Sequence, residues 1–135
     1  MPAHHDRVAA NLACRFTGQA PLNGEPLGGL LYVTGQMPLD PATGELAPGG
    51  ITEQTDQVMR NLARVLELCG SSLESVIRSG GYLTSMDLYP GFNAAYSRWF
   101  RPPRPARTCI AVTGLAVGAL VEVDLVAALD GSTRA

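Results

Sequence analysis

Residues 52–70 read TEQTDQVMRNLARVLELCG and form the clearest helical pattern in the chain. Apolar side chains recur there at helical spacing, while polar side chains fill the other side; the apolar ones are Val58, Leu62, Val65, Leu66 and Cys69. Thr52 can cap the start of this helix, and Gly70 suits the C′ position after its end. Because such a helix is apolar on one side only, the segment predicts a helix that covers one face of a sheet.

Apolar segments on both sides of this helix predict five strands, which span 11–16, 30–34, 75–85, 107–112 and 120–129. Residues 35–36 are expected to end the second of these strands. Gly80 and Gly81 lie inside the third strand, where glycine indicates a β-bulge or a close approach of another backbone. The strands therefore lie on both sides of the helix in the sequence.

A second helix is expected over residues 89–100, with an apolar stripe made of Phe92, Ala95, Tyr96, Trp99 and Phe100. The proline-rich residues 101–105 end it. The resulting order of elements predicts a single α+β domain over residues 1–135, with both helices on one sheet face and flexible tails at about 1–7 and 130–135. The opposite sheet face is also apolar and needs cover, so we expect the chain to form an oligomer over it.

The composition is that of a globular protein, with 46% hydrophobic and 16% charged residues. A net charge of −2 argues against nucleic acid as a partner, and the apolar runs are too short for a membrane span. No segment typical of a signal peptide opens the chain, so the cytoplasm is the expected compartment. All ten basic residues are arginine, which excludes chemistry that needs a lysine, such as a Schiff base or pyridoxal phosphate.

Histidine and cysteine are sparse and scattered. His4 and His5 lie in a polar N-terminal stretch, so no histidine-based triad or metal site is expected in the core. The three cysteines, Cys14, Cys69 and Cys109, form no Cys-x-x-Cys pair and predict neither a disulfide framework nor a zinc site.

Charged residues on two apolar strands mark the candidate site. Arg107 and Cys109 are two residues apart and face the same way on a strand, as do Glu122 and Asp124 on another. Burying a guanidinium or a carboxylate on an apolar strand costs free energy unless the group is paired with an opposite charge or binds a ligand. These residues therefore indicate either a structural ion pair or a small-molecule site.

Six short motifs lie in order along about residues 28–128. They are Thr34-Gly35-Gln36-Met37-Pro38-Leu39-Asp40, Thr43-Gly44-Glu45, Gln54-Thr55 through Asn61-Leu62, Phe92-Asn93-Ala94-Ala95-Tyr96, Pro105-Ala106-Arg107-Thr108-Cys109 and Val121-Glu122-Val123. In this order and spacing they resemble the RidA/YjgF family of reactive enamine/imine deaminases.

The resemblance implies a chorismate-mutase-like fold of the Bacillus type, with a mixed sheet, two helices on one face and a homotrimer around the other. It implies three clefts between subunits, in which enamines or imines of the 2-aminoacrylate type are hydrolysed to 2-oxo acids and ammonia without a cofactor or metal. One residue departs from the pattern, because Pro21 stands where many of these deaminases have a tyrosine that lines the cleft. That departure bears on the identity of the substrate.

The resemblance also assigns roles to residues. Arg107 would hold the carboxylate of a small imine or enamine in a bidentate manner, and Glu122 would position or activate the attacking water. Cys109, Asn93 and Gly35 would line the cleft. The residues themselves leave alternatives open: Arg107 as a structural ion-pair partner, Glu122 as a salt-bridge or trimer-contact residue, Cys109 as a packing residue, and Asn93 as a residue that caps or buttresses a helix turn.

Two further functions are compatible with the same residues. One is a pathway-specific deaminase of a larger conjugated enamine, similar to 2-aminomuconate. The other is a non-catalytic trimeric protein that binds a small carboxylate.

Overall fold

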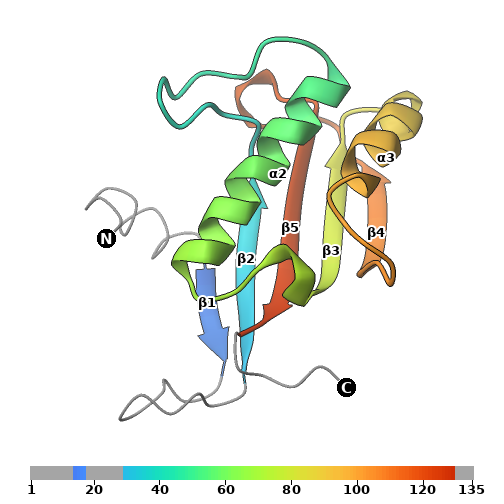
Figure 1. Ribbon diagram of the computed structural model, residues 1–135. Helices are drawn as coiled ribbons and strands as arrows, with labels where there is room; N and C mark the ends of the chain where they lie inside the picture. The colour runs from blue at the N-terminus through green and yellow to red at the C-terminus, as the bar shows by residue number, and fades with distance from the viewer. Residues whose placement is uncertain (1–13, 18–28, 130–135) are drawn as a thin grey trace.

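The computed structural model describes residues 14–17 and 29–129, which form a five-stranded mixed sheet with two α-helices on one face (Figure 1). The strands are ordered β1-β2-β5-β3-β4; β3 and β4 are parallel, and the other neighbours are antiparallel. The elements are β1 (Cys14–Thr17), β2 (Leu30–Gln36), α2 (Ile51–Leu68), β3 (Val76–Leu83), α3 (Tyr89–Ser97), β4 (Ala106–Ala111) and β5 (Val121–Ala128), with short 3₁₀ turns η1 (Leu73–Ser75), η2 (Met86–Leu88) and η3 (Ala116–Gly118).

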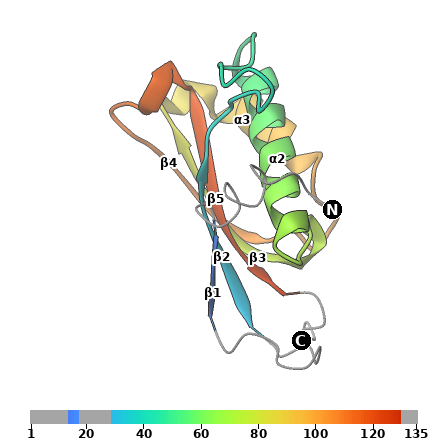
Figure 2. The ribbon, with the colours of Figure 1, turned by 90° about the vertical axis from the view of Figure 1, so that its left-hand side faces the viewer.

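Both helices lie on the same side of the sheet, and no described helix covers the other side (Figure 2). The predicted α+β architecture is therefore confirmed. The expected tails, His4, His5 and Pro21 lie outside the described residues.

Helix α2 begins two residues earlier than the sequence predicts. Gly50, not Thr52, is its N-cap, and the carboxylate of Glu53 accepts a hydrogen bond from the Gly50 amide at 2.9 Å. At the other end Gly70 adopts φ +81° as expected, and the Ser71 amide donates to the Leu66 carbonyl at 2.8 Å. Glycine at C′ thus lets the chain turn sharply from α2 toward β3.

The hydrophobic core lies between the two helices and the sheet face that they cover. The predicted stripe of α2 supplies Val58, Leu62, Val65 and Leu66, all of which are buried. The sheet supplies alternate residues of its central strands: Leu31, Val33, Val76, Leu83, Val121, Val123, Leu125 and Ala127. Within the described part of the chain, no helix has the length and apolar character needed to cross a bilayer.

Gln54 of α2 departs from the expected polar side of the helix. It is buried, and its side-chain oxygen accepts a hydrogen bond from the Leu120 amide at 2.9 Å. Because this bond satisfies a backbone group just before β5, it fixes the start of the central strand against the helix.

Two predictions about strands are wrong in detail. Strand β2 continues through Gly35 to Gln36, with a register shift against β5 after Val33. In β3 the register shift lies between Val76 and Arg78, not at the glycines. Gly80 and Gly81 pair regularly with both neighbouring strands, so it is the close approach of neighbouring groups that requires glycine there.

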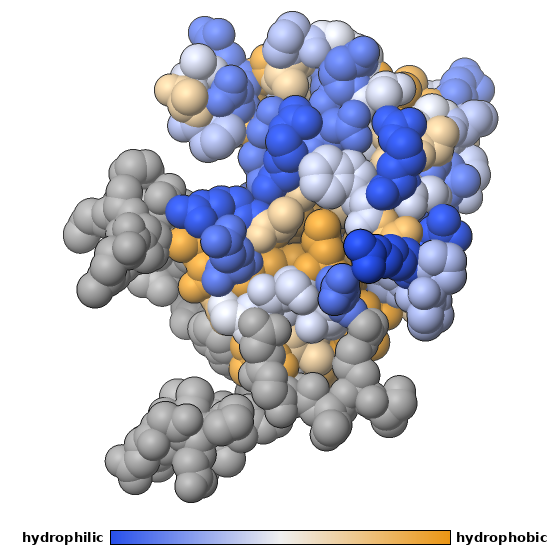
Figure 3. Space-filling model, viewed as in Figure 1, coloured by the Kyte–Doolittle hydropathy of each residue, from blue (hydrophilic) through white to orange (hydrophobic). Residues whose placement is uncertain are grey.

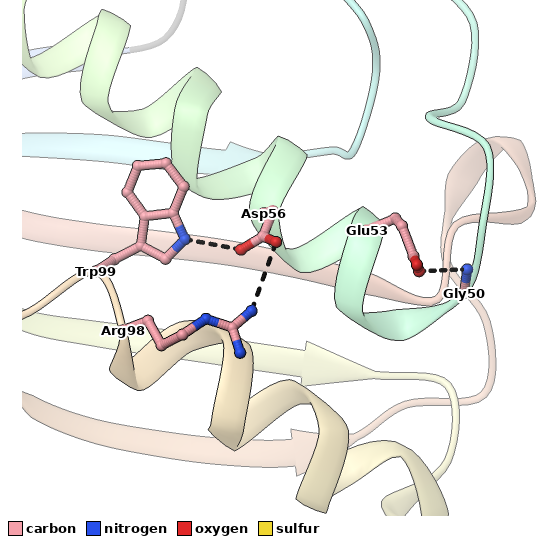
Figure 4. Close-up of polar contacts among 5 residues, drawn as sticks. All are labelled: Gly50, Glu53, Asp56, Arg98 and Trp99. Atoms are coloured by element: carbon pink, nitrogen blue, oxygen red, sulfur yellow. Dashed lines mark hydrogen bonds and ion pairs between the residues drawn. The ribbon is translucent and has the colours of Figure 1, made fainter.

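The end of α3 is tied to α2 by a shared carboxylate (Figure 4). The indole nitrogen of Trp99 donates to Asp56 at 2.9 Å, and the Arg98 guanidinium lies 3.6 Å from the other oxygen of the same carboxylate. Helix α3 itself ends at Ser97, three residues before the predicted end, and Phe100 packs into the core from the following turn. The Asp56 contacts fix the end of α3 against α2.

Candidate functional site

The candidate residues of β5 point away from the helices. Along this strand Val121, Val123 and Leu125 are buried against α2, whereas Glu122 and Asp124 alternate with them and face the uncovered side of the sheet. Glu122 pairs across the sheet with Tyr82 of β3. This alternation, which the sequence predicts, places both carboxylates on the open face.

Arg107 lies on the opposite face, against α3. One of its nitrogens, Nη2, donates to the hydroxyl oxygen of Tyr89 at 2.9 Å and to Oδ1 of Asn93 at 2.9 Å. The guanidinium carbon lies 4.7 Å from the ring centre of Tyr96, 5.4 Å from that of Phe92 and 5.6 Å from that of Tyr89. Three aromatic faces and two oxygen acceptors therefore hold the cation in one orientation.

Arg107 has no acidic partner among the residues that the structure describes. Among residues 29–129 no carboxylate lies within ion-pair distance of its guanidinium. Arg107 and Glu122 therefore form no ion pair with each other within one chain. Asn93, for which both a cleft-lining and a buttressing role were open, orients the guanidinium directly.

Cys109 shares the face of Arg107, as predicted, and packs at the edge of the core. Burial raises the pKa of its thiol, and the nearby charge of Arg107 offsets this only in part. Since the thiolate is the nucleophilic form, this environment favours a packing role for the cysteine.

Glu122 lies across the backbone of its neighbouring strand. A Cβ atom added to Gly35 would lie 2.5 Å from a carboxylate oxygen of Glu122, so a larger residue there would force the Glu122 side chain to move. Burial, and then the negative charge of Asp124, raise the pKa of the Glu122 carboxyl. Asp124 in turn lies over Gly80 and accepts a hydrogen bond from the Tyr82 hydroxyl at 2.8 Å.

Gly35→Ala should destabilise the fold by about 0.5–1.5 kcal/mol, because the added methyl group forces the Glu122 side chain out of its preferred rotamer. Gly114 provides a matched control, since a Cβ there meets no atom within 4 Å. Urea unfolding of the two alanine variants measures the difference. Equal stabilities would show that Glu122 is not held over Gly35.

The chain does not bring Arg107 and Glu122 together, because they lie on opposite faces of one sheet. On the helix side, hydrophobic side chains gather in a hollow framed by hydrophilic ones (Figure 3). One cavity of about 460 Å³ lies between η1 and the link from α3 to β4, and another of about 680 Å³ lies between α2 and the residues after β2. Gly35 lines the second cavity, but neither cavity includes Arg107 or Glu122. A site that uses both residues therefore needs a second copy of the chain.

The open face of the sheet offers apolar area for such a contact. Tyr32 on β2 is 48% exposed and Ile110 on β4 is 46% exposed. Ile110 continues the cross-strand row of Glu122 and Tyr82, and Tyr32 pairs with Val126 of β5. Large apolar side chains on a face that also carries carboxylates are typical of a surface that another chain covers.

Two residues of the site are not found from the sequence pattern. Tyr89 contacts Arg107 from the first turn of α3, and Tyr82 contacts Asp124 across the sheet. Tyr82 follows Gly80 by two residues on β3, so both face the side of the sheet on which Asp124 lies. This spacing was the signal in the sequence for the contact between Tyr82 and Asp124. Tyr89 is 18 positions from Arg107 in sequence, and only the tertiary structure joins them.

Comparisons with known proteins agree with this architecture. Residues 22–129 match the family described as Endoribonuclease L-PSP. A RutC family protein of Pyrococcus horikoshii is 38% identical over 100 residues, which cover 74% of this chain and 79% of the relative. A Thermotoga maritima crystal structure matches with TM-score 0.73 and 38% identity, covering 87% of this chain and 98% of the other. A Rid family protein of Yersinia pestis matches with TM-score 0.72 and 29% identity, covering 82% of this chain and 91% of the other.

Proposed function

The chain belongs to the Endoribonuclease L-PSP family, which includes the RidA/YjgF and RutC proteins, and from this premise we propose that it deaminates small carboxylate-bearing imines and enamines. The observation that carries the proposal is Arg107, a cation held in place by aromatic rings with no acidic partner among the described residues. A preorganised, unneutralised guanidinium is suited to an anionic substrate.

Glu122 supports the hydrolytic part of the proposal. Because its pKa is raised by burial and by Asp124, the carboxyl group can exchange a proton closer to neutral pH than an ordinary glutamate. Asp124 shares the open face, but the Tyr82 hydroxyl donates to its carboxylate. This assigns proton transfer to Glu122 and a supporting position to Asp124.

The proposed reaction adds water to the carbon of the C=N bond. The imine reacts in its protonated form, C=NH₂⁺. The Glu122 carboxylate takes one proton from the attacking water as the C–O bond forms, and the π electrons of the C=N bond move to nitrogen, which becomes a neutral amine. The carboxylic acid then returns this proton to the nitrogen and the C–N bond breaks to release ammonia, while the hydroxyl group of the intermediate passes its proton through the Glu122 carboxylate to solvent as the C=O bond forms. The products are one 2-oxo acid and one ammonia, and Arg107 holds the substrate carboxylate throughout.

The proposal includes a homotrimer around the open sheet face. Two observations support it: Arg107 and Glu122 face opposite sides of one sheet, and the open face exposes Tyr32 and Ile110. In an oligomer the Arg107 of one copy can face the Glu122 of another. The substrate cleft then lies between subunits.

Ile110→Asp should separate the trimer, because it places a charge in an apolar subunit contact. Sedimentation should give three times the 14.2 kDa chain mass for the unchanged protein and one times that mass for the variant. Arg60→Asp puts the same residue on the exposed side of α2 and should leave the trimer intact. A monomeric unchanged protein would contradict the proposal.

Hydrolysis of 2-iminopropanoate tests the function. The imine is generated from alanine by an amino acid oxidase, and its decay is followed with and without the protein. We expect decay well above the spontaneous rate. Preference for a larger conjugated enamine would favour the pathway-specific deaminase. No acceleration, together with binding of 2-oxopropanoate, would favour the non-catalytic binding protein.

The family description also names endoribonuclease activity. The net charge of −2 and the two carboxylates on the open face disfavour the binding of an RNA backbone. Single-stranded RNA is therefore a suitable negative control substrate in the same preparation.

A further inference from the structure

The donors of Arg107 are used unevenly. Its guanidinium has five N–H groups on three nitrogens, yet both recorded hydrogen bonds come from Nη2, to Tyr89 and to Asn93. A carboxylate bound in bidentate fashion needs two neighbouring nitrogens of the same edge. Two edges of the guanidinium can bind a carboxylate in this way, Nε with Nη2 and Nη1 with Nη2, and Nη2 belongs to both. With its two N–H groups taken, Arg107 cannot grip a carboxylate with two parallel bonds unless Tyr89 or Asn93 moves.

The hydroxyl group of Tyr89 is placed to supply the missing donor. Its oxygen accepts from Arg107 at 2.9 Å, which leaves its own O–H group to donate. Among the residues of ranges 14–17 and 29–129, no acceptor for this O–H is recorded. The ring also lies against the guanidinium, so the hydroxyl is held beside the cation.

Building on the proposed function, we infer that Tyr89 and Arg107 together form the carboxylate-binding element of the site. One carboxylate oxygen accepts from an N–H of Nη1 or Nε of Arg107, and the other accepts from the Tyr89 hydroxyl. Asn93 keeps its bond to Nη2 and holds the guanidinium still. The element selects a small monocarboxylate, because a carboxamide offers only one acceptor oxygen to the two donors.

A purely structural role for Tyr89 makes the opposite prediction. If its hydroxyl only supported Arg107, removing it would free one N–H of Nη2 and open an edge for bidentate binding. Carboxylate affinity would then stay the same or increase. The sign of the change in affinity therefore distinguishes a binding residue from a supporting one.

Calorimetric titration of Tyr89→Phe with 2-oxopropanoate tests the inference. The ring remains over Arg107 and only the hydroxyl is lost, so we expect about tenfold weaker binding. Binding of the neutral 2-oxopropanamide should change less than about twofold. Thr52→Ala, which removes a hydroxyl from the exposed side of α2, is the control and should bind 2-oxopropanoate as the unchanged protein does.

Unchanged or tighter binding of 2-oxopropanoate by Tyr89→Phe would overturn the inference, as would a protein that does not bind this anion at all. An equal loss for the acid and the amide would also overturn it, because the hydroxyl would then act on the shape of the site. The titration needs no turnover. If binding depends on Tyr89 but no imine is hydrolysed, the deaminase proposal fails and this inference stands.

Discussion

Arg107→Ala lowers kcat/KM for 2-iminopropanoate by about 30-fold to about 4,000-fold. Truncating one partner of a hydrogen-bonded charge pair costs about 2–5 kcal/mol of binding free energy. Each 1.4 kcal/mol corresponds to a tenfold change in kcat/KM, which gives this range. The carboxylate loses its counter-charge, and Asn93 and Tyr89 lose the group that they orient. Steady-state kinetics measure the effect, and circular dichroism checks that the fold is retained.

A neutral imine without a carboxylate is the control substrate for this variant. Since the substitution removes an anchor for the anion, its hydrolysis should change much less than that of 2-iminopropanoate. Arg107→Lys keeps the charge but not the planar donor group, so its activity should fall between those of the unchanged protein and the alanine variant. Unchanged kcat/KM in Arg107→Ala would remove Arg107 from the site.

Glu122→Gln lowers kcat by about 10²-fold to 10⁴-fold, which is the usual contribution of a positioned general acid or base. The amide keeps the shape of the side chain over Gly35 but cannot take a proton from water. Binding of the substrate carboxylate depends on Arg107, so KM should change little. Initial rates over a range of substrate concentrations separate the two constants.

The pH profile of kcat identifies the group. Glu122 must be ionised to act as a base, so activity is present above its pKa and falls as the pH drops through that value. Because burial and Asp124 raise this pKa, the fall should begin at a higher pH than an ordinary glutamate gives. The fall should be absent in Glu122→Gln and move to lower pH in Asp124→Asn. An unmoved fall in both variants would assign it to another group.

The periodic parts of the structure could be predicted from the sequence. The apolar stripe of α2 and its end at Gly70 follow from local spacing, and both are observed. Alternation along a strand also placed Glu122 and Asp124 on one face. These predictions succeed because burial repeats with the period of the element.

The predictions that were wrong concern residues whose positions depend on contacts between segments far apart in the sequence. Gln54 is polar and was assigned to the exposed side of α2, but a backbone amide before β5 needed its oxygen. Gly35 was expected to end a strand, whereas the strand continues through it and the Glu122 side chain of β5 occupies the space beside it. The opposite orientation of Arg107 and Glu122 depends on the register of β4 and β5 against β3, which no single segment encodes.

The position of β5 has a consequence for the synthesis of the chain. This last strand, Val121–Ala128, lies in the middle of the sheet and pairs with both β2 and β3. Until β5 leaves the ribosome, β2 and β3 each lack one neighbouring strand, and the core side chains of α2 lack the β5 side chains against which they pack. The sheet can therefore close between β2 and β3 only after β5 has been synthesised.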